Sequence, residues 1–357
     1  MRVVVKIGTA SLTDERGGIV RSAIENLCAE VVSAVSEGHD VLIVSSGAVA
    51  AGVAAVGLDQ RPTDMTTLQA VSAAGQSRLM EVYNAALGAG GLVAAQVLLD
   101  PHDFVDRSQY LHARRTLERL LELGCVPVIN ENDAIASEEL RYGDNDRLAA
   151  LVAHALRADL LVLLTDADGL FTADPRNDPN ATLIPLVAAD DPLLAINVTA
   201  AGSGRGSGGM ASKLAAARIA SWSGIRTVIS RAATVGVLGA AIRGDGPGTI
   251  FAAHTRRLTA RRLWIAFAAE VSGCITVDDG AHAALIANGR SLLAAGITAV
   301  AGDFVAGDTV EVRDTGGKVF ARGLVTCAAA ELSGGAGNVS ARPPEVIHRD
   351  DLVIVPG

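Results

Sequence analysis

Val3-Val4-Val5-Lys6-Ile7-Gly8-Thr9 opens the chain as a short apolar run that contains one lysine and ends in a glycine and a threonine. A second apolar run, Val41 to Val44, is followed by Ser45-Ser46-Gly47. The segment between the two runs has apolar residues at helical spacing, and these are Ile24, Leu27, Val31 and Val35. This strand, helix, strand unit predicts parallel strands covered by helices.

The ends of the first helix are also marked in the sequence. Ser22-Ala23-Ile24-Glu25 has the spacing of a capping box, in which a serine and a glutamate satisfy the first backbone amides. Gly38 follows the last apolar position and is expected to end the helix, because glycine readily adopts the left-handed conformation found there.

The same alternation of short apolar runs and longer amphipathic segments continues to about residue 250. The expected strands are Val3 to Lys6, Val41 to Val44, Val93 to Leu98, Val126 to Ile129, Leu160 to Leu164 and Arg226 to Ile229. This pattern predicts an α/β fold of three layers, with a mostly parallel central sheet between two layers of helices.

Polar turns follow four of these strands. They are Gly8-Thr9, Ser45-Ser46-Gly47, Asn130-Glu131-Asn132-Asp133 and Thr165-Asp166. Ligands bind open parallel sheets at the carboxyl ends of the strands, where loops and helix N-termini converge. We therefore expect the four turns to form one site.

The alternation of apolar runs and amphipathic segments ends beyond Phe251. A basic, polar stretch from Thr255 to Arg262 precedes short apolar pieces separated by Gly or Asp turns, so we place a domain boundary near Thr259. The predicted domains are residues 1–258 and a small, mostly β module at 264–357 with one helix near Ala281 to Asn288. The module carries eleven acidic and six basic residues from Trp264 onward, which argues against a polyanion-binding surface.

Composition excludes several classes of protein. The net charge of -9 and a pI near 5.3 disfavour nonspecific binding to nucleic acid or to an anionic membrane. The four cysteines form no CxxC pair and the histidines form no HExxH motif, so neither a disulfide framework nor a structural metal is expected. No signal peptide or membrane span is evident, and we expect a cytoplasmic protein.

Lysine is scarce in this chain. Of 30 basic residues only Lys6, Lys213 and Lys318 are lysines, leaving 27 arginines. Lys6 precedes Gly8, and Lys213 follows the glycine-rich segment 202–209 at the start of a predicted helix from Met210 to Ala220. A compact ammonium can enter a crowded phosphate cluster as a point charge, which favours a phosphate site. The alternatives are a solvated strand end for Lys6 and a flexible linker for the glycine-rich segment.

Two polar clusters, Asn130 to Asp133 and Gly143 to Asp146, lie beside apolar runs. Their carboxylates could orient an ammonium group, bind a metal, or hold lysines by charge pairing. Asp144-Asn145-Asp146 lacks the spacing and terminal glutamate of a calcium loop, so we reject calcium. Thr165-Asp166 and the loop that follows could hold the ribose or base of a nucleotide, or form an ordinary aspartate-capped turn.

These segments, in this order, resemble the amino acid kinase family. The matching pieces are Val5 to Thr9, Ser46-Gly47-Ala48, Ala74-Gly75-Gln76, Val128 to Asp133, Gly143 to Asp146, Leu164 to Asp166, Gly208-Gly209-Met210 and Lys213. The C-terminal module resembles a PUA domain through Ile275 to Asp278, Gly280 and His348 to Asp351. The resemblance covers nearly the whole chain, and it is closest to the members that phosphorylate glutamate.

The resemblance implies ATP-dependent phosphorylation of the γ-carboxylate of L-glutamate to L-glutamyl 5-phosphate, the first step of proline biosynthesis. It implies that Lys6 and Lys213 neutralise the transferring phosphoryl group and that Asp146 holds them. Ser46, Asp133 and Asn145 would bind glutamate. The ATP-binding residues would be Lys6, Thr165, Asp166, Ser207, Gly208, Gly209, Met210, Ala211, Ser212 and Lys213, with Mg²⁺ on the ATP phosphates. The resemblance to this family further implies a dimer or tetramer and feedback inhibition by L-proline.

Two alternatives stay open. The chain could be another kinase of this superfamily, acting on N-acetylglutamate, aspartate or a nucleoside monophosphate. Asp133 discriminates among these, because a free substrate ammonium requires an acidic partner and an acetylated one does not. The other alternative is RNA binding through residues 264–357, which the acidity of this module disfavours.

Overall fold

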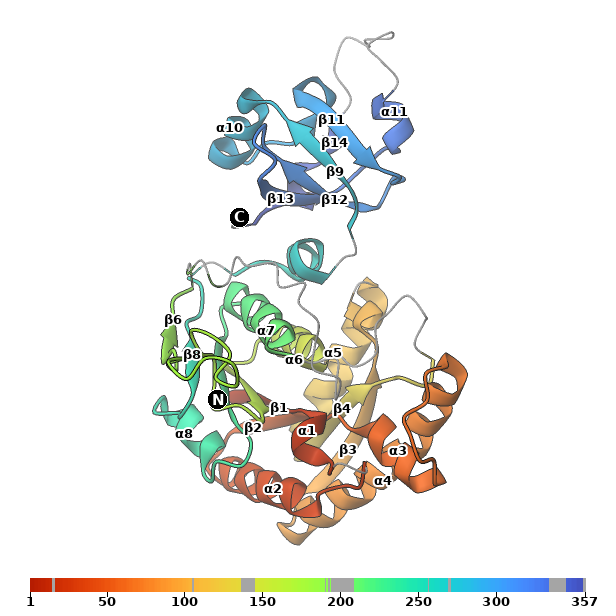
Figure 1. The fold of residues 1–357 in the computed structure, drawn as a ribbon, viewed down its shortest axis with the longest axis vertical. Coiled ribbons are helices and arrows are strands. Elements are labelled where there is room, and N and C mark those ends of the chain that lie inside the picture. The colour runs from red at the N-terminus through yellow and green to blue at the C-terminus, as the bar shows by residue number, and fades with distance from the viewer. Residues whose placement is uncertain are drawn as a thin grey trace. The chain divides into compact units, whose positions relative to one another are not determined.

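The computed structural model describes residues 1–14, 17–104, 106–135, 145–189, 191, 193, 209–255, 257–268, 271–333 and 345–355. These residues form two compact units, one extending to Arg257 and the other beginning at Leu258. Each unit has its own sheet (Figure 1).

The first unit is built on an eight-stranded sheet. Its strands are β1 (Arg2–Ile7), β2 (Asp40–Val44), β3 (Val93–Leu99), β4 (Cys125–Glu131), β5 (Leu160–Thr165), β6 (Leu186–Val187), β7 (Arg226–Arg231) and β8 (Thr249–Phe251). They lie in the order β3-β4-β2-β1-β5-β7-β8-β6, and only the β7–β8 pair is antiparallel. The predicted mostly parallel sheet is therefore confirmed, while the short strands β6 and β8 were not anticipated.

Helices cover both faces of this sheet (Figure 1). They are α1 (Thr9–Leu12), α2 (Arg21–Ser36), α3 (Ala48–Val56), α4 (Met65–Ala89), α5 (Arg107–Glu122), α6 (Asn145–Ala155), α7 (Met210–Trp222) and α8 (Val237–Arg243), with the 3-10 turn η1 (Pro101–Phe104). No helix in the described part of the chain is long and apolar enough to cross a membrane.

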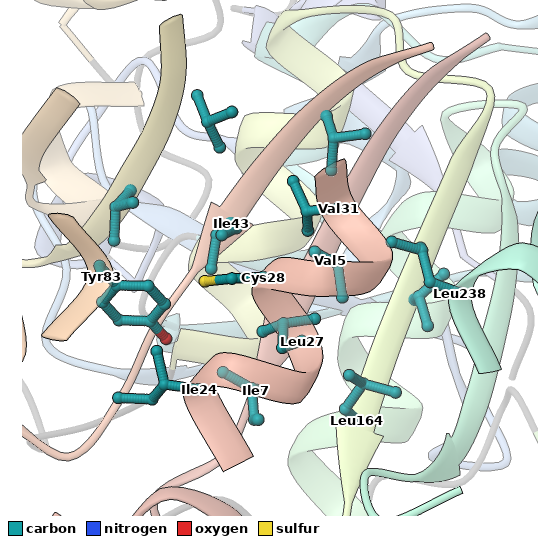
Figure 2. Packing of buried hydrophobic residues seen from close by; sticks show 14 of the residues in the cluster. Val5, Ile7, Ile24, Leu27, Cys28, Val31, Ile43, Tyr83, Leu164 and Leu238 are labelled. Carbon is teal, nitrogen blue, oxygen red and sulfur yellow. The ribbon is translucent and has the colours of Figure 1, made fainter. Parts of the chain in front are cut away.

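Strand β1 separates the apolar core of one face from the polar site on the other. Val3, Val5 and Ile7 join a core cluster with buried residues of α2, α4 and α8 (Figure 2). Because side chains alternate across a strand, Lys6 faces the opposite side of the sheet. A lysine on a central strand cannot be the solvated edge residue that the sequence left open, and Lys6 is only 3% exposed.

Helix α2 begins differently from the prediction. Its N-cap is Val20, which makes no side-chain capping hydrogen bond, so the expected capping box of Ser22 and Glu25 was wrong. An isolated bridge between Thr13 and Ile19 and the hydrogen bond from the Val20 amide to the Leu12 carbonyl fix the preceding chain. With the preceding chain held by these local contacts, the helix begins at Arg21.

Gly38 ends α2 as predicted. Its φ of 86° is in the left-handed region, and the His39 amide donates to the Ala34 carbonyl at 3.1 Å. This hydrogen bond closes the last turn in the manner of a Schellman motif.

Helices α3 and α4 are in backbone contact through two glycines. A Cβ atom on Gly52 would lie 1.7 Å from the Val71 carbonyl oxygen, and one on Gly75 would lie 1.8 Å from the Ala48 carbonyl oxygen. Since Ala48 is the first residue of α3, this contact sets where α3 starts relative to the Ser46-Gly47 turn. Close helix packing and the position of that turn are thus coupled.

The second unit contains a five-stranded sheet in the order β11-β9-β12-β13-β15 and a separate β10–β14 pair. Its strands are β9 (Val271–Val277), β10 (Leu292–Leu293), β11 (Ile297–Gly302), β12 (Thr309–Arg313), β13 (Val319–Leu324), β14 (Glu345–Ile347) and β15 (Leu352–Ile354). Its helical segments are α9 (Ala260–Leu263), η3 (Trp264–Ala268), α10 (Asp279–Asn288), η4 (Ala294–Gly296), α11 (Ala329–Ser333) and η5 (Arg349–Asp351). The mostly β character with a helix near Ala281 to Asn288 is confirmed.

Replacing Gly75 with alanine tests the backbone contact between α3 and α4. We expect Gly75→Ala to lower the free energy of unfolding by about 2 kcal/mol, because the added methyl group collides with backbone that cannot rotate away. Gly88→Ala in the same helix is the control, since nothing lies within 4 Å of its Cβ position. Urea unfolding measures both, and equal stabilities for the two variants would contradict the close packing.

Candidate active site

The four polar turns predicted to form a site lie at one edge of the sheet. Strands β4, β2, β1 and β5 are consecutive neighbours and run parallel, so their carboxyl ends point the same way. Helix α6 begins at Asn145 and helix α7 at Met210. Asp146 in the first turn of α6 contacts both Lys6 of β1 and Lys213 in the first turn of α7.

Lys6, Asp146 and Lys213 form a buried ion triad. Lys6 Nζ lies 2.7 Å from Asp146 Oδ1, and Lys213 Nζ lies 3.1 Å from Asp146 Oδ2. Both lysine side chains are 4% exposed and the Asp146 side chain is fully buried. Both ammonium groups thus contact the same carboxylate where water has little access.

Burial raises the pKa of the Asp146 carboxyl, but the Lys6 and Lys213 ammonium groups act more strongly together and hold that pKa below its ordinary value. Asp146 is therefore ionised at neutral pH. Its position in the first turn of α6 adds to this, because the positive end of a helix dipole favours an anion.

Lys213 occupies a position that helix electrostatics alone would disfavour. It lies in the first turn of α7, where the backbone amides already carry partial positive charge. The Asp146 carboxylate offsets this cost. A buried cation at the positive end of a helix is a mark of function more than of stability.

A second polar cluster joins the ends of β2, β4 and α6. Asn145 Nδ2 donates to Ser46 Oγ and to Asn130 Oδ1, both at 3.1 Å. Within the described residues, the buried atoms Asn130 Nδ2 and Asn145 Oδ1 have no hydrogen-bond partner. A free donor and a free acceptor side by side favour a polar ligand at this point, since buried polar groups are nearly always paired.

Asp133 is buried near this cluster and is held by helix α4. Ser72 Oγ donates to Asp133 Oδ2 at 2.7 Å. Burial raises the pKa of Asp133, and the Ser72 hydrogen bond and the charge of Arg61 oppose that rise without cancelling it. A buried carboxylate of this kind is stabilised by a cationic partner such as an ammonium group.

The residues expected to bind ATP are only partly described. Thr165 ends β5 in a buried position, and its hydroxyl donates to the exposed Asp166 carboxylate at 3.0 Å. Gly209 is the N-cap of α7, and Met210, Ala211, Ser212 and Lys213 form the first turn of that helix. Ser207 and Gly208 lie outside the described residues.

Three residues of this region were not selected from the sequence. Asn130 stands within a predicted polar cluster, so its side-chain contact with Asn145 was within reach. Ser72 and Tyr83 lie within α4, and the sequence around them does not predict a contact with the edge of the sheet. A polar group on an otherwise buried helix face is the one signal that points to them.

Comparison with known proteins agrees with this geometry. The model of the amino acid kinase family matches residues 1–230, and the model of the PUA domain matches residues 273–347. The chain belongs to the amino acid kinase family. The resemblance predicted from the ordered motifs is thereby confirmed, and so is that of the C-terminal module to a PUA domain.

Curated relatives are similar over nearly the whole of this amino acid kinase. The Glutamate 5-kinase of Thermobifida fusca is 46% identical over 99% of this chain and 93% of the relative. The Glutamate 5-kinase of Mycolicibacterium vanbaalenii is 45% identical over 99% of this chain and 96% of the relative. The isopentenyl phosphate kinase of T. acidophilum has the same fold, with a TM-score of 0.50 and 18% identity over 70% of this chain and 100% of that one.

Asp146→Asn tests the ion triad of this amino acid kinase. We expect it to lower the free energy of unfolding at pH 7 by on the order of 3 kcal/mol, because two buried ammonium groups lose their counter-charge. The depressed pKa of Asp146 means that this stabilisation is present above the ordinary value of 3.8 and is lost as the pH falls through the folded-state pKa.

Asp168→Asn is the matched control, since it removes a carboxylate from an exposed pair with Arg231. This substitution is expected to lower the free energy of unfolding by under about 1 kcal/mol. Urea unfolding at pH 7 compares the two variants, and a loss for Asp146→Asn no larger than that of the control would contradict the triad.

Proposed function

We propose that this chain catalyses ATP-dependent phosphorylation of the γ-carboxylate of L-glutamate, which forms L-glutamyl 5-phosphate and ADP and begins proline biosynthesis. Relatives named Glutamate 5-kinase, similar over 99% of the chain, support this activity. ATP and glutamate are metabolites of the cytoplasm, so the enzyme is assigned there.

The buried ion triad is the observation that carries the proposal. Lys6 and Lys213 bring two ammonium groups to one place, where the Asp146 carboxylate holds both. These ammonium groups offset the negative charge on the transferring phosphoryl group. Phosphoryl transfer needs positioning and charge stabilisation more than covalent chemistry, and preorganised cations supply both.

The acceptor site is assigned to the polar cluster beside the triad. Asp133 binds the glutamate ammonium, and Ser46 and Asn145 bind the rest of the amino acid. Asn130 Nδ2 and Asn145 Oδ1, which have no hydrogen-bond partner among the described residues, add a donor and an acceptor for the substrate. The γ-carboxylate is ionised at neutral pH and attacks without a general base.

ATP is assigned to the end of β5 and the start of α7. Thr165 and Asp166 flank the nucleotide, and the loop from Ser207 to Lys213 binds its phosphates through backbone amides at the N-terminus of α7. Mg²⁺ is assigned to the phosphates of ATP, where it neutralises charge when bound.

The domain assignment of residues 1–258 to catalysis and 264–357 to the PUA-like module belongs to the same proposal. The acidity of the module favours a structural or regulatory role over RNA binding. If the module bound structured RNA, affinity would fall steeply with salt, and a titration at two salt concentrations detects this. The family also favours a dimer or tetramer.

Lysine variants test the catalytic assignment. We expect Lys6→Ala and Lys213→Ala each to lower kcat about 100-fold, because a lost transition-state contact costs on the order of 3 kcal/mol. The KM for glutamate should change much less. Lys318→Ala is the control, since Lys318 lies in an exposed turn of the second unit. Trapping glutamyl phosphate with hydroxylamine measures turnover. A near-normal rate in either active-site variant would contradict the catalytic role of the two lysines.

Substrate choice is tested with the same hydroxamate assay. Glutamate should give product, whereas N-acetylglutamate lacks the ammonium that Asp133 requires and aspartate is one methylene too short. Uridine monophosphate, followed by ADP release, should give no turnover. A rate with N-acetylglutamate, aspartate or uridine monophosphate above that with glutamate would assign the chain to another branch of the family.

Feedback inhibition is the last expectation drawn from the family. L-Proline should raise the apparent KM for glutamate without changing kcat, because it competes near the acceptor site. Initial rates at several glutamate concentrations measure this competition. Rates that stay unchanged at high proline concentration would contradict feedback inhibition by L-proline.

A further inference from the structure

Helix α4 carries a polar stripe on its buried face. Ser72, Gln76 and Tyr83 are 1%, 9% and 0% exposed. At 100° per residue these positions lie within about 40° of one another around the helix axis. Most buried neighbours on the same helix are apolar, including Leu79 and Leu87. Three polar side chains in one line on a buried face require partners, and the partners identify what the stripe does.

Each member of the stripe contacts a segment at the carboxyl edge of the sheet. Ser72 Oγ donates to Asp133 Oδ2 at 2.7 Å, and Gln76 Nε2 lies 3.5 Å from the Glu131 carbonyl oxygen. The Tyr83 hydroxyl lies 2.9 Å from Ser45 Oγ. The stripe therefore reaches both the turn after β2 and the loop after β4, which are separated by more than 80 residues along the chain.

The Tyr83 contact bears directly on the β2 turn. Ser45 Oγ donates onward to the Ser46 carbonyl oxygen at 3.2 Å, and the Ser45 amide donates to the Ile129 carbonyl. Gly47 follows in the left-handed conformation with φ of 92°. The ring of Tyr83 is embedded among Ile24, Cys28 and Ile43 in the main core (Figure 2), so its hydroxyl is held in place by packing.

The stripe and the ion triad use different faces of the sheet. Tyr83 belongs to the core cluster of Val3, Val5 and Ile7, whereas Lys6 projects from β1 to the other side and contacts Asp146 of α6, which also contacts Lys213 of α7. Loss of a stripe hydroxyl should therefore disturb the acceptor site and leave the triad intact.

We propose that Ser72 and Tyr83 are positioning residues that set the affinity for the acceptor amino acid, Ser72 by orienting the Asp133 carboxylate and Tyr83 by fixing the Ser45-Ser46 turn. This inference rests on the proposed assignment of Asp133 and Ser46 to substrate binding.

Two variants that remove only a hydroxyl test the inference. Ser72→Ala and Tyr83→Phe are each expected to raise the KM for glutamate about 5-fold, while kcat and the KM for ATP stay within about 2-fold of the unaltered enzyme. The control is Ser221→Ala, which removes a fully buried serine hydroxyl that donates to the Ala252 carbonyl at 2.8 Å and contacts neither loop. If Tyr83→Phe does not fold, Ser45→Ala removes the same hydrogen bond from its other end.

The outcomes separate this inference from the proposed function. An unaltered enzyme that forms no hydroxamate from glutamate overturns the proposed function itself. The positioning role alone is overturned if the unaltered enzyme is active but the variants bind glutamate normally. That result would be a KM for glutamate in Ser72→Ala, and in Tyr83→Phe or Ser45→Ala, equal to that of the control Ser221→Ala. A fall in kcat and a rise in the KM for ATP that are as large as the rise in the KM for glutamate also overturn the positioning role, because that pattern indicates general distortion of the enzyme.

Discussion

Asp146 lies fully buried between the ammonium groups of Lys6 and Lys213, and the geometry of the whole site depends on that carboxylate. Without it, two like charges would be confined at short range in a region of low dielectric, which is a strongly unfavourable arrangement. With it, both ammonium groups are held in place by one carboxylate. The same contact ties β1, α6 and α7 to one another at the edge of the sheet.

The fold explains how segments far apart in the chain supply this contact. Consecutive parallel strands place their carboxyl ends at one edge, and α6 and α7 present their first turns there. On the other face, α4 packs against the core and extends hydroxyls to the loops after β2 and β4. One face thus carries the ion triad, and the other carries the helix whose hydroxyls contact the loops after β2 and β4.

Much of this arrangement could be predicted from the sequence, because it rests on local patterns. Apolar runs ending in polar turns predicted the parallel sheet and its functional edge, and the rarity of lysine singled out Lys6 and Lys213. The start of α2 at Arg21 was missed because backbone contacts of Ile19 and Val20 with Thr13 and Leu12 fix the chain just before it. The strands β6 and β8 were missed because they pair with distant segments. Ser72 and Tyr83 were missed for the same reason. Their polar partners are 61 and 38 residues away along the chain.

The central claim is that both lysines act on the transferring phosphoryl group while Asp146 holds them. A crystal structure of the enzyme with L-glutamate, Mg²⁺ and a non-hydrolysable ATP analogue tests this most directly. We predict that Nζ of Lys6 and Nζ of Lys213 both lie within hydrogen-bonding distance of γ-phosphate oxygens and remain in contact with Asp146. A γ-phosphate bound away from either lysine, or a lysine that leaves Asp146 and turns to solvent, would contradict the account.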